Sequence, residues 1–424
     1  MPHIGVICPP LPGHVNPLCA LARSLIRRGH RVTFFQVSDL NPLVRREHVD
    51  FIAVGRARFP PGALHRYVTK LRYLQGLSSL RATIDYARRM AALILEDAPD
   101  ALRGARVDAL IVDQNEPAGA TVAEYMRLPF ISACTSLPLN REPLIPPPFT
   151  GWTYADSTFA RARNRIGYGI ADALIRPIHG TMNQYRRQWG LRPLATPDDS
   201  FSRSAEVAQM PREFDFPRAN LPATFHYCGP WFDGSSLRSD FPFERLDGRP
   251  LIYGSLGTLQ RKDSEHFRTI AAACAGLDVQ LVLSLGPHEG PAPADLPGDP
   301  IVVDYAPQLK LLSRAALAIT HAGMNTTQQA LHYGVPLVAI PLAHDQPAIA
   351  SRLARTGAGI VIRPRGLSVE ALRNAIREVL PANSSYRWNA ERLRAASEKA
   401  GGVERAAGIA EAALSRGYGR GASV

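Results

Sequence analysis

The chain has 424 residues, 46% of them hydrophobic, and a formal net charge of +12 at pH 7. This length and composition allow a large core and favour two domains. No run approaches the ~20 apolar residues of a membrane-spanning helix, and the start lacks a secretory signal. The five cysteines are scattered without metal-ligand spacing, so we expect no metal site and a reducing, cytoplasmic location.

The positive charge comes almost entirely from arginine, since only Lys70, Lys262, Lys310 and Lys399 are lysines among 49 basic residues. A GC-rich genome produces such a bias whatever the protein does. The basic residues cluster between positions 161 and 192, where contact with anionic lipid headgroups is the preferred functional interpretation. No nucleic-acid motif is present, so nucleic acid is not an expected partner.

In chain order, short apolar strands alternate with helical segments, which is typical of a parallel sheet with helices on both faces. Asn16 is the predicted cap of the first helix, Pro17 starts it and Gly29 ends it. Residues 138–155 are proline-rich and irregular, and residues 161–190 are expected to be helical. The predicted strands are 4–8, 31–37, 107–112 and 130–134, with helices at 17–28 and 117–125.

A second series of strands and helices follows a loop-rich region at residues 212–250. Its predicted strands are 251–254, 279–285, 301–304, 317–320, 337–340 and 359–362, with helices at 325–333, 368–380, 384–400 and 403–416. We therefore predict an α/β fold of two Rossmann-like, doubly wound parallel-sheet domains that face each other across a cleft. The predicted parts are an acceptor-binding domain (1–228), a nucleotide-sugar-binding domain (229–402) and a C-terminal helix (403–424) that packs back on the first domain.

The segment from His321 to Gln346 is the most informative part of the chain. A strand ends before His321, a turn of small residues follows, and Asn325 opens a helix that stops at Gly334. Backbone N–H groups and the dipole at such a helix N-terminus favour an anion such as a diphosphate. Asp345 and Gln346 follow the next strand, where their side chains suit a neighbouring polyol. The segment therefore predicts a nucleotide-sugar site.

His14 and Asp113 are candidates for acid–base chemistry in the first domain. His14 lies in the predicted turn between the first strand and its helix, and a histidine of near-neutral pKa can take a proton from an attacking hydroxyl. Asp113 ends a later strand and could orient the imidazole and stabilise the imidazolium. A surface or capping histidine and a helix-capping aspartate are the alternatives.

Two other turns could meet the same ligand. Residues 254–258 form a Gly-Ser-Leu-Gly-Thr turn that could approach a diphosphate, although a tight structural turn is an equal alternative. Tyr305 follows a strand and could stack on a base or only fill core space. The presence of all these elements in this order favours a nucleotide-sugar enzyme.

Over nearly its whole length the sequence resembles the GT-B inverting UDP-glycosyltransferase superfamily. The segment HAGMN (321–325) is found throughout that superfamily and is specific for nucleotide-sugar binding. Other segments resemble the narrower group of bacterial zeaxanthin glucosyltransferases of carotenoid biosynthesis. These segments are PPGAL (60–64), VDQNEPAGA (112–120), LPLNREP (137–143), SLGTLQ (255–260) and PLAHDQPAIASR (341–352).

The resemblance implies glucose transfer from UDP-glucose to a hydroxyl by direct displacement, which gives a β-glucoside without a metal or other cofactor. His14 would be the general base and Asp113 its partner. The implied donor site comprises Ser255, His321, Asn325 and Thr326 with the turn at Gly323 for the diphosphate, Tyr305, Ala306 and Gln308 for the uridine, and Asp345 with Gln346 for the glucose.

Two positions depart from the pattern of many relatives. Tyr305 stands where they have tryptophan, which would weaken base stacking. Gln329 stands eight residues after His321, where they have a glutamate that binds the ribose hydroxyls. A neutral amide forfeits a charge-assisted hydrogen bond, so the choice between uridine and thymidine donors stays open.

The acceptor implied by the resemblance is a carotenoid, which is long and apolar and carries a terminal ring hydroxyl. It needs an apolar channel that ends at His14, and its location in a bilayer predicts peripheral membrane contact. Candidate lining residues are Phe59, Leu64, Leu139, Ile145, Pro147, Phe149 and Trp152. The alternatives are another apolar aglycone (macrolide, polyketide or sterol), a nucleotide-sugar epimerase of the same fold, or a non-catalytic binding protein.

Overall fold

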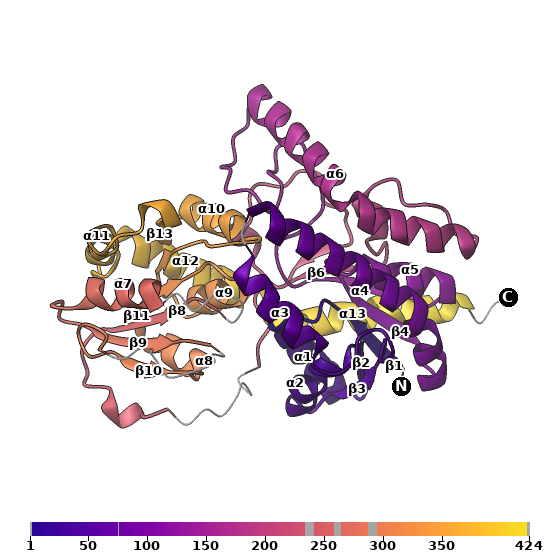
Figure 1. The fold of residues 1–424 in the computed structure, drawn as a ribbon, viewed down its shortest axis with the longest axis horizontal. Coiled ribbons are helices and arrows are strands. Elements are labelled where there is room, and N and C mark those ends of the chain that lie inside the picture. Colours follow the sequence, from indigo (N-terminus) through magenta and orange to yellow (C-terminus); the bar gives the residue numbers. More distant parts are fainter. Residues whose placement is uncertain (1, 75, 234–240, 258–263, 287–294, 422–424) are drawn as a thin grey trace.

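The computed structural model describes residues 2–74, 76–233, 241–257, 264–286 and 295–421. The chain forms two α/β parts that lie side by side (Figure 1). Each part is built on one sheet, and every strand pair in both sheets is parallel. The predicted fold of two doubly wound parallel-sheet domains is therefore confirmed.

The order of strands reverses once in each sheet. The first sheet consists of β3 (Asp50–Ala53), β2 (Arg31–Gln36), β1 (His3–Ile7), β4 (Ala109–Asp113), β5 (Phe130–Cys134), β6 (Glu206–Ala208) and β7 (Phe225–Tyr227). The second consists of β10 (Ile301–Val303), β9 (Gln280–Ser284), β8 (Leu251–Ser255), β11 (Ala315–Thr320), β12 (Leu337–Ala339) and β13 (Gly359–Val361). The reversals lie between β1 and β4 and between β8 and β11, and ligands bind beyond such strand ends.

The described helices are distributed over both parts. Those of the first part are α1 (Pro12–Arg27), α2 (Asn41–Arg46), α3 (Ala63–Tyr73), α4 (Gly76–Ala105), α5 (Pro117–Met126) and α6 (Thr158–Gln188). Those that follow are α7 (Ser264–Cys274), α8 (Gln308–Leu312), α9 (Met324–His332), α10 (Gln346–Thr356), α11 (Val369–Val379), α12 (Ser385–Ala400) and α13 (Gly402–Gly421). Short 3₁₀ turns are η1 (Ser38–Leu40), η2 (Pro197–Ser200), η3 (Arg212–Phe214), η4 (Phe243–Arg245) and η5 (Pro364–Gly366).

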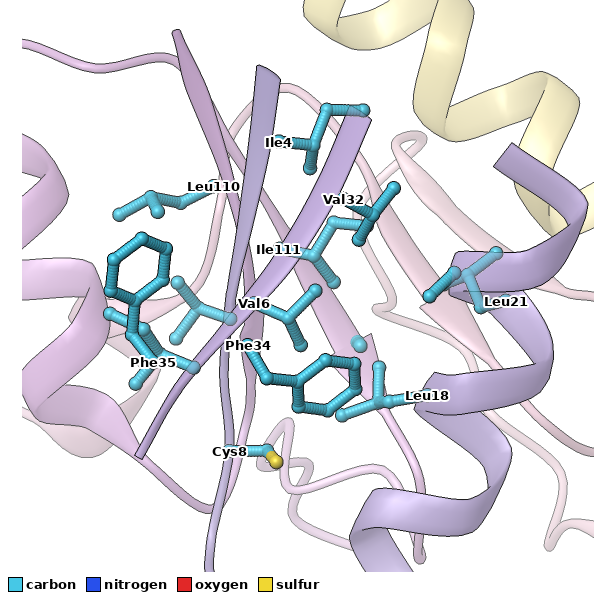
Figure 2. Packing of buried hydrophobic residues seen from close by; sticks show 14 of the residues in the cluster. Ile4, Val6, Cys8, Leu18, Leu21, Val32, Phe34, Phe35, Leu110 and Ile111 are labelled. Carbon is cyan, nitrogen blue, oxygen red and sulfur yellow. The ribbon is translucent and has the colours of Figure 1, made fainter. Parts of the chain in front are cut away.

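The central strands of the first sheet are buried on both faces, as their continuous apolar runs require. Figure 2 shows Phe34 on the α1 side, beside Leu18, and Phe35 on the opposite side, beside Leu110. Side chains alternate between the faces of a strand, so the two neighbouring rings pack in the core on opposite faces of the sheet. The core therefore fixes β1 and α1, the elements that carry His14.

The last helix, α13, lies against the first part of the chain. Ala406, Ala410 and Leu414 belong to the same buried cluster as the residues of β1 and α1. Arg28 at the end of α1 donates hydrogen bonds to Glu404 and Glu411 of α13. Figure 1 shows the yellow α13 crossing from the second part to the first, close to α1.

The structure contains elements that the sequence analysis does not predict, above all between residues 38 and 106 and in the three-residue strands β6 and β7. Strands of three residues are too short to show an alternating pattern. The long helix α4 has Pro99 inside it, and an internal proline normally argues against a continuous helix. The expected interdomain region 212–250 includes η3, β7 and η4.

A buried ion pair connects the two parts. Arg352 of α10 donates from Nε to Asp215 Oδ1 at 2.7 Å, and Arg218 donates to the other oxygen of Asp215 at 2.9 Å. The Asp215 and Arg352 side chains are 0% and 2% exposed. Burial by itself would raise the pKa of the Asp215 carboxyl, but Arg218 and Arg352 hold that pKa below its usual range. Asp215 therefore stays charged inside the protein.

We expect Asp215→Asn to lower the free energy of unfolding by about 3–5 kcal/mol at pH 7, because it leaves buried guanidinium charge uncompensated. The depressed pKa means that wild type keeps this stabilisation above the ordinary pKa of aspartate and loses it only as pH falls through the folded value. Urea denaturation at several pH values checks both statements. Asp156→Asn, which removes an exposed ion pair with Arg161, serves as the control and should cost less than about 1 kcal/mol.

Candidate active site

The two reversals of strand order place four of the predicted site residues. His14 follows β1 and Asp113 ends β4, so both lie at the reversal of the first sheet. Ser255 ends β8 and His321 follows β11, at the reversal of the second sheet. Hydrogen bonds between the two parts join these regions, as described below. The carboxyl edges of the two sheets therefore contribute to one site.

The position of His14 differs from the prediction. The sequence analysis places His14 in a turn before a helix that starts at Pro17 with Asn16 as its cap, but α1 starts at Pro12 and Asn16 lies within it. The His14 N–H donates to the Leu11 carbonyl at 2.9 Å, and a proline at the first helical position has its φ already set for a helix. His14 is consequently held in the first turn of α1 instead of in a free loop.

His14 and Asp113 meet as a hydrogen-bonded pair. His14 Nδ1 lies 3.0 Å from Asp113 Oδ2 and 2.8 Å from Thr135 Oγ1. The Thr135 hydroxyl donates to the same carboxylate oxygen, and the Asn115 N–H donates to Oδ1 at 2.8 Å. A carboxylate acceptor at Nδ1 favours the tautomer with its proton there, which leaves the Nε2 lone pair free. This arrangement suits a general base.

The electrostatics of the pair keep both groups ready for proton transfer. Burial alone would lower the pKa of His14, but the charge and hydrogen bond of Asp113, with a smaller contribution from Asp345, raise that pKa above 6.5. Burial would raise the pKa of Asp113, yet His14, Thr135 and Asn115 lower it. Asp113 is fully buried, whereas the His14 side chain is 18% exposed. The imidazole can thus be reached while its partner is shielded.

Thr135 and Gln209 are site residues that the sequence analysis does not identify. Thr135 directly follows the predicted strand that ends at Cys134, so its hydroxyl at a strand end could have identified it as a site candidate. Gln209 follows β6, which carries no recognisable pattern. Its Nε2 donates to the Thr135 carbonyl and, at 2.9 Å, to Asn325 Oδ1. Gln209 therefore connects the dyad to the second part of the chain.

Asn325 binds the backbone next to His14. Its Nδ2 donates to the Gly13 carbonyl at 3.1 Å. In an α-helix that carbonyl would accept from the N–H four residues later, but this residue is Pro17, which has no N–H. Pro17 thereby leaves the Gly13 carbonyl free for Asn325. Asn325, a residue predicted to bind the diphosphate, is thus hydrogen-bonded to the turn that holds His14.

Asp345 and Gln346 lie at the start of α10, on the second part of the chain. The Ser136 hydroxyl, from the segment after β5, donates to Asp345 Oδ2. Gln346 Oε1 accepts from the N–H groups of Leu342 and Ala343 at 2.8 and 2.9 Å. Asp345 therefore lies next to the segment after β5. The side-chain oxygen of Gln346 stabilises the loop before α10, so only the Gln346 NH₂ group remains for a ligand.

The His321 ring sits between two glycines. A Cβ added to Gly257 would lie 2.6 Å from His321 Cε1, and one added to Gly323 would lie 2.5 Å from Nε2. Gly257 also has a φ of +82°, which L side chains rarely adopt. Burial lowers the pKa of His321 to about 4. The ring is therefore neutral at pH 7 and can offer a diphosphate an N–H, as can the backbone at the N-terminus of α9.

Gln308, Thr326 and Gln329 form a polar cluster beside that turn. Gln308 Nε2 donates to Gln329 Oε1, and Gln308 Oε1 accepts from the Tyr253 hydroxyl at 3.0 Å. Thr326 Oγ1 lies 3.5 Å from the same Gln308 oxygen. The structure thus brings together the residues predicted for the uridine base, the ribose and the diphosphate.

The remaining donor-site candidates lie along the same edge of the second sheet. Ser255 is buried at the end of β8, and its hydroxyl is 3.5 Å from the Gly257 N–H. Tyr305 is 51% exposed after β10. Ala306 packs against the core of the second part. Residues 258–260 of the SLGTLQ segment lie outside the described residues.

The predicted acceptor residues fall into two groups. Leu64 belongs to the core cluster of the first part, and Phe59 packs against it and against the edge of Tyr86, with ring centroids 6.0 Å apart. Leu139, Ile145, Pro147, Phe149 and Trp152 lie on the irregular segment between β5 and α6. Ile145 is fully buried, Phe149 is 44% exposed and Leu139 is partly buried. Pro147 and Trp152 approach the same position of α6, since a Cβ on Gly167 would lie 3.0 Å from Pro147 Cγ and 2.8 Å from Trp152 Cζ3.

The same segment touches the second part of the chain. The Trp152 carbonyl accepts from the Ser351 hydroxyl of α10 at 3.0 Å. A Cβ on Gly151 would lie 3.3 Å from Pro347 Cβ. Since α10 begins at the predicted glucose ligands, the segment lies between the dyad and the donor half of the site.

Neither a metal cluster nor a membrane helix is found in the described ranges. No three His, Cys, Asp or Glu side chains among those residues are grouped to hold a metal ion. Every helix in the described part of the chain is too short or too polar to span a bilayer.

Comparison with known proteins finds relatives of this chain. Residues 62–398 match the model of a family described as UDP-glucoronosyl and UDP-glucosyl transferase. A zeaxanthin glucosyltransferase of Pantoea ananas is 38% identical, over 98% of this chain and 97% of its own length. A second protein of that name, from Pseudescherichia vulneris, is 34% identical over 98% of both chains.

Solved structures share the fold. The glycosyltransferase of kitacinnamycin aligns with a TM-score of 0.76 over 97% of this chain and 99% of its own, at 22% identity. CalG4, the calicheamicin glycosyltransferase, aligns with a TM-score of 0.74 over 98% and 99% of the two chains, also at 22% identity. These similarities extend to both sheets.

We expect Pro17→Ala to lower kcat about 3- to 10-fold, because the new N–H competes with Asn325 for the Gly13 carbonyl and one hydrogen bond is worth about 0.5–1.5 kcal/mol. The same change removes an internal helix proline, so thermal stability should not fall. Steady-state kinetics and thermal denaturation together check this. Asn16→Ala, at an exposed neighbouring position of α1, is the control, and equal kinetics for the two variants would contradict the role of Pro17.

Proposed function

Because the chain belongs to the UDP-glucoronosyl and UDP-glucosyl transferase family, and is thus a glycosyltransferase, we propose that it transfers glucose from UDP-glucose to a carotenoid hydroxyl. Zeaxanthin is the proposed acceptor and a β-glucoside the product. The observation that carries the acceptor is the full-length similarity to two zeaxanthin glucosyltransferases, at 38% and 34% identity. The proposal includes peripheral contact with the membrane that dissolves such an acceptor.

The proposed chemistry starts at His14. The acceptor hydroxyl gives its proton to Nε2 while its oxygen attacks the anomeric carbon of glucose from the side opposite the diphosphate. The bond between that carbon and the diphosphate oxygen breaks, and UDP leaves with the electron pair. Asp113 stabilises the resulting imidazolium through Nδ1–H. Base catalysis of this kind contributes about 10²–10⁴ in rate.

The donor half would use the groups at the edge of the second sheet. The neutral His321 ring, the N–H groups at the start of α9 and the Ser255 hydroxyl would bind the diphosphate and stabilise the charge that develops on it. Gln308 and Gln329 would meet the base and ribose, and Tyr305 would stack on the base. Asp345 would exchange its hydrogen bond from Ser136 for hydroxyl groups of glucose.

The first test is product formation from detergent-dispersed zeaxanthin with UDP-glucose, TDP-glucose or no donor, followed by chromatography with mass detection. Hexose addition that is lost in His14→Ala supports the acceptor class and the base together. If UDP-glucose binds but no product forms, the carotenoid assignment fails. A screen of macrolide, polyketide and sterol alcohols would then identify the acceptor.

We expect the pH profile of kcat/KM to fall on the acid side, through a pKa above 6.5, because His14 must be neutral to accept a proton. Asp113→Asn removes the charge that raises this pKa, so burial should then shift the limb to lower pH while kcat falls about 10²-fold or more. Profiles of wild type and variant from pH 5 to 9 test this. An acid limb that stays in place would mean that another group titrates.

We expect Gln329→Glu to tighten UDP-glucose binding about tenfold, because a carboxylate can make a charge-assisted bond to the ribose hydroxyls. The variant keeps an oxygen to accept from Gln308, so the local structure should survive. Isothermal titration with UDP-glucose and TDP-glucose measures the effect. Unchanged or weaker affinity for UDP-glucose would remove Gln329 from the ribose site.

A further inference from the structure

The first half of α6 has large apolar side chains that face solvent. Phe159, Ile166 and Ile170 are 76%, 65% and 55% exposed. Their spacings of seven and four residues place them on one side of an α-helix. Figure 1 shows this half of α6 projecting away from both sheets. An exposed row of this kind marks an interaction surface more often than a scattered surface residue does.

Another side of α6 already packs against the rest of the protein. Ala160, Asn164, Gly167 and Ala171 are buried, and they recur at spacings of four, three and four residues. A Cβ on Gly167 would lie 2.8 Å from Trp152 Cζ3. The helix is therefore anchored through one face, and the row of Phe159, Ile166 and Ile170 is not needed to hold it in place.

Positive charge borders the exposed row. Arg165 and Arg176 are both exposed and stand eleven positions apart, so they share one side of the helix next to the row. Neither makes an ion pair with a residue that the structure describes. The nearby acid Asp172 is already paired with Arg141, at 2.6 Å. Apolar side chains flanked by unpaired arginines are complementary to a surface that is apolar below an anionic layer.

Hydrogen bonds connect α6 to the segment that contacts the pair of His14 and Asp113. Asn164 donates to the Pro143 carbonyl at 3.1 Å, and Arg163 donates to the Thr153 carbonyl at 2.9 Å. These carbonyls belong to the segment that starts at Thr135, the residue bonded to His14. The segment after β5 is therefore hydrogen-bonded to α6, which carries the exposed row, and through Thr135 to His14.

We propose that the face of α6 formed by Phe159, Ile166, Ile170, Arg165 and Arg176 docks on an anionic lipid bilayer and brings the acceptor segment to the membrane surface. The inference rests on the proposed function in one respect, since a bilayer-dissolved acceptor explains why docking is useful. Insertion of three apolar side chains and the attraction of two arginines to the anionic surface supply the affinity.

Flotation with lipid vesicles tests the docking face directly. Wild type should bind phosphatidylglycerol-containing vesicles and bind pure phosphatidylcholine vesicles weakly. Phe159→Ser, Ile166→Ser and Ile170→Ser together should reduce binding at least about tenfold. Trp388→Ser, which removes a 68% exposed ring from α12, is the matched control and should bind as wild type does. Equal binding by the triple variant and wild type would overturn the proposal.

A second pair of variants tests the charges. Arg165→Glu with Arg176→Glu should abolish the preference for anionic vesicles, and added salt should weaken wild-type binding. Arg365→Glu with Arg377→Glu, two exposed positions on the second part, changes the net charge equally and should leave binding intact. If both pairs lower binding alike, overall charge and not the α6 face is responsible.

Activity measurements separate this inference from the proposed function. The triple serine variant should glucosylate detergent-dispersed zeaxanthin at the wild-type rate and lose at least about tenfold with vesicle-embedded zeaxanthin. Absence of any product with wild type in detergent would reject the proposed function while flotation still decides the docking. A wild-type dimer in light scattering that the triple variant converts to monomer would assign the face to a second copy of this chain and overturn the proposal.

Discussion

Parallel strand pairing is the constraint on which the site depends. In a parallel sheet all strands bring their carboxyl ends to one edge, and a reversal of strand order leaves an opening between the loops there. Each sheet has one reversal, and His14 with Asp113 follows the first while Ser255 with His321 follows the second. Residues distant in sequence therefore become neighbours without any dedicated local motif. In the proposed reaction the chemistry is divided accordingly, with the base on one sheet and the anion-binding groups on the other.

Hydrogen bonds between the two parts of the chain fix the position of one half of the site relative to the other. Polar groups of the two parts find partners across the boundary, namely Asn325 with Gly13 and Gln209, and Ser136 with Asp345, and each such hydrogen bond adds a modest net stabilisation. Pro17 makes the first of these contacts possible because it removes the N–H that would occupy the Gly13 carbonyl. The buried pair of Asp215 and Arg352 holds α10 against the first part. If Asn325 and Asp345 bind the donor as proposed, they would give up some of these bonds. Donor binding would then affect the position of His14.

The irregular segment after β5 connects the surroundings of His14 with α10 and α6. It begins with Thr135, which contacts the dyad, reaches α10 through Trp152, and packs beneath α6. A change in how α6 packs on this segment would therefore alter contacts near both His14 and α10. An apolar acceptor leaves the bilayer at a cost that grows with the apolar area exposed. Under the proposed docking, α6 would bring this segment to the bilayer surface and would shorten the path of such an acceptor through water.

The sequence by itself determined the two-sheet α/β class, most central strands, the family and the pairing of His14 with Asp113, because apolar runs and strand-end motifs are local patterns. It could not place His14 in the first turn of α1, since the helix start is set by Pro12 and the Leu11 carbonyl and not by the expected Asn16 cap. Thr135 and Gln209 enter the site only through tertiary contacts, and β6, which positions Gln209, is too short for any periodicity. The exposed row on α6 was also decided by the fold, because a helical apolar stripe normally faces the core. Only packing reveals that Ala160, Asn164, Gly167 and Ala171, on another side of α6, form its buried face.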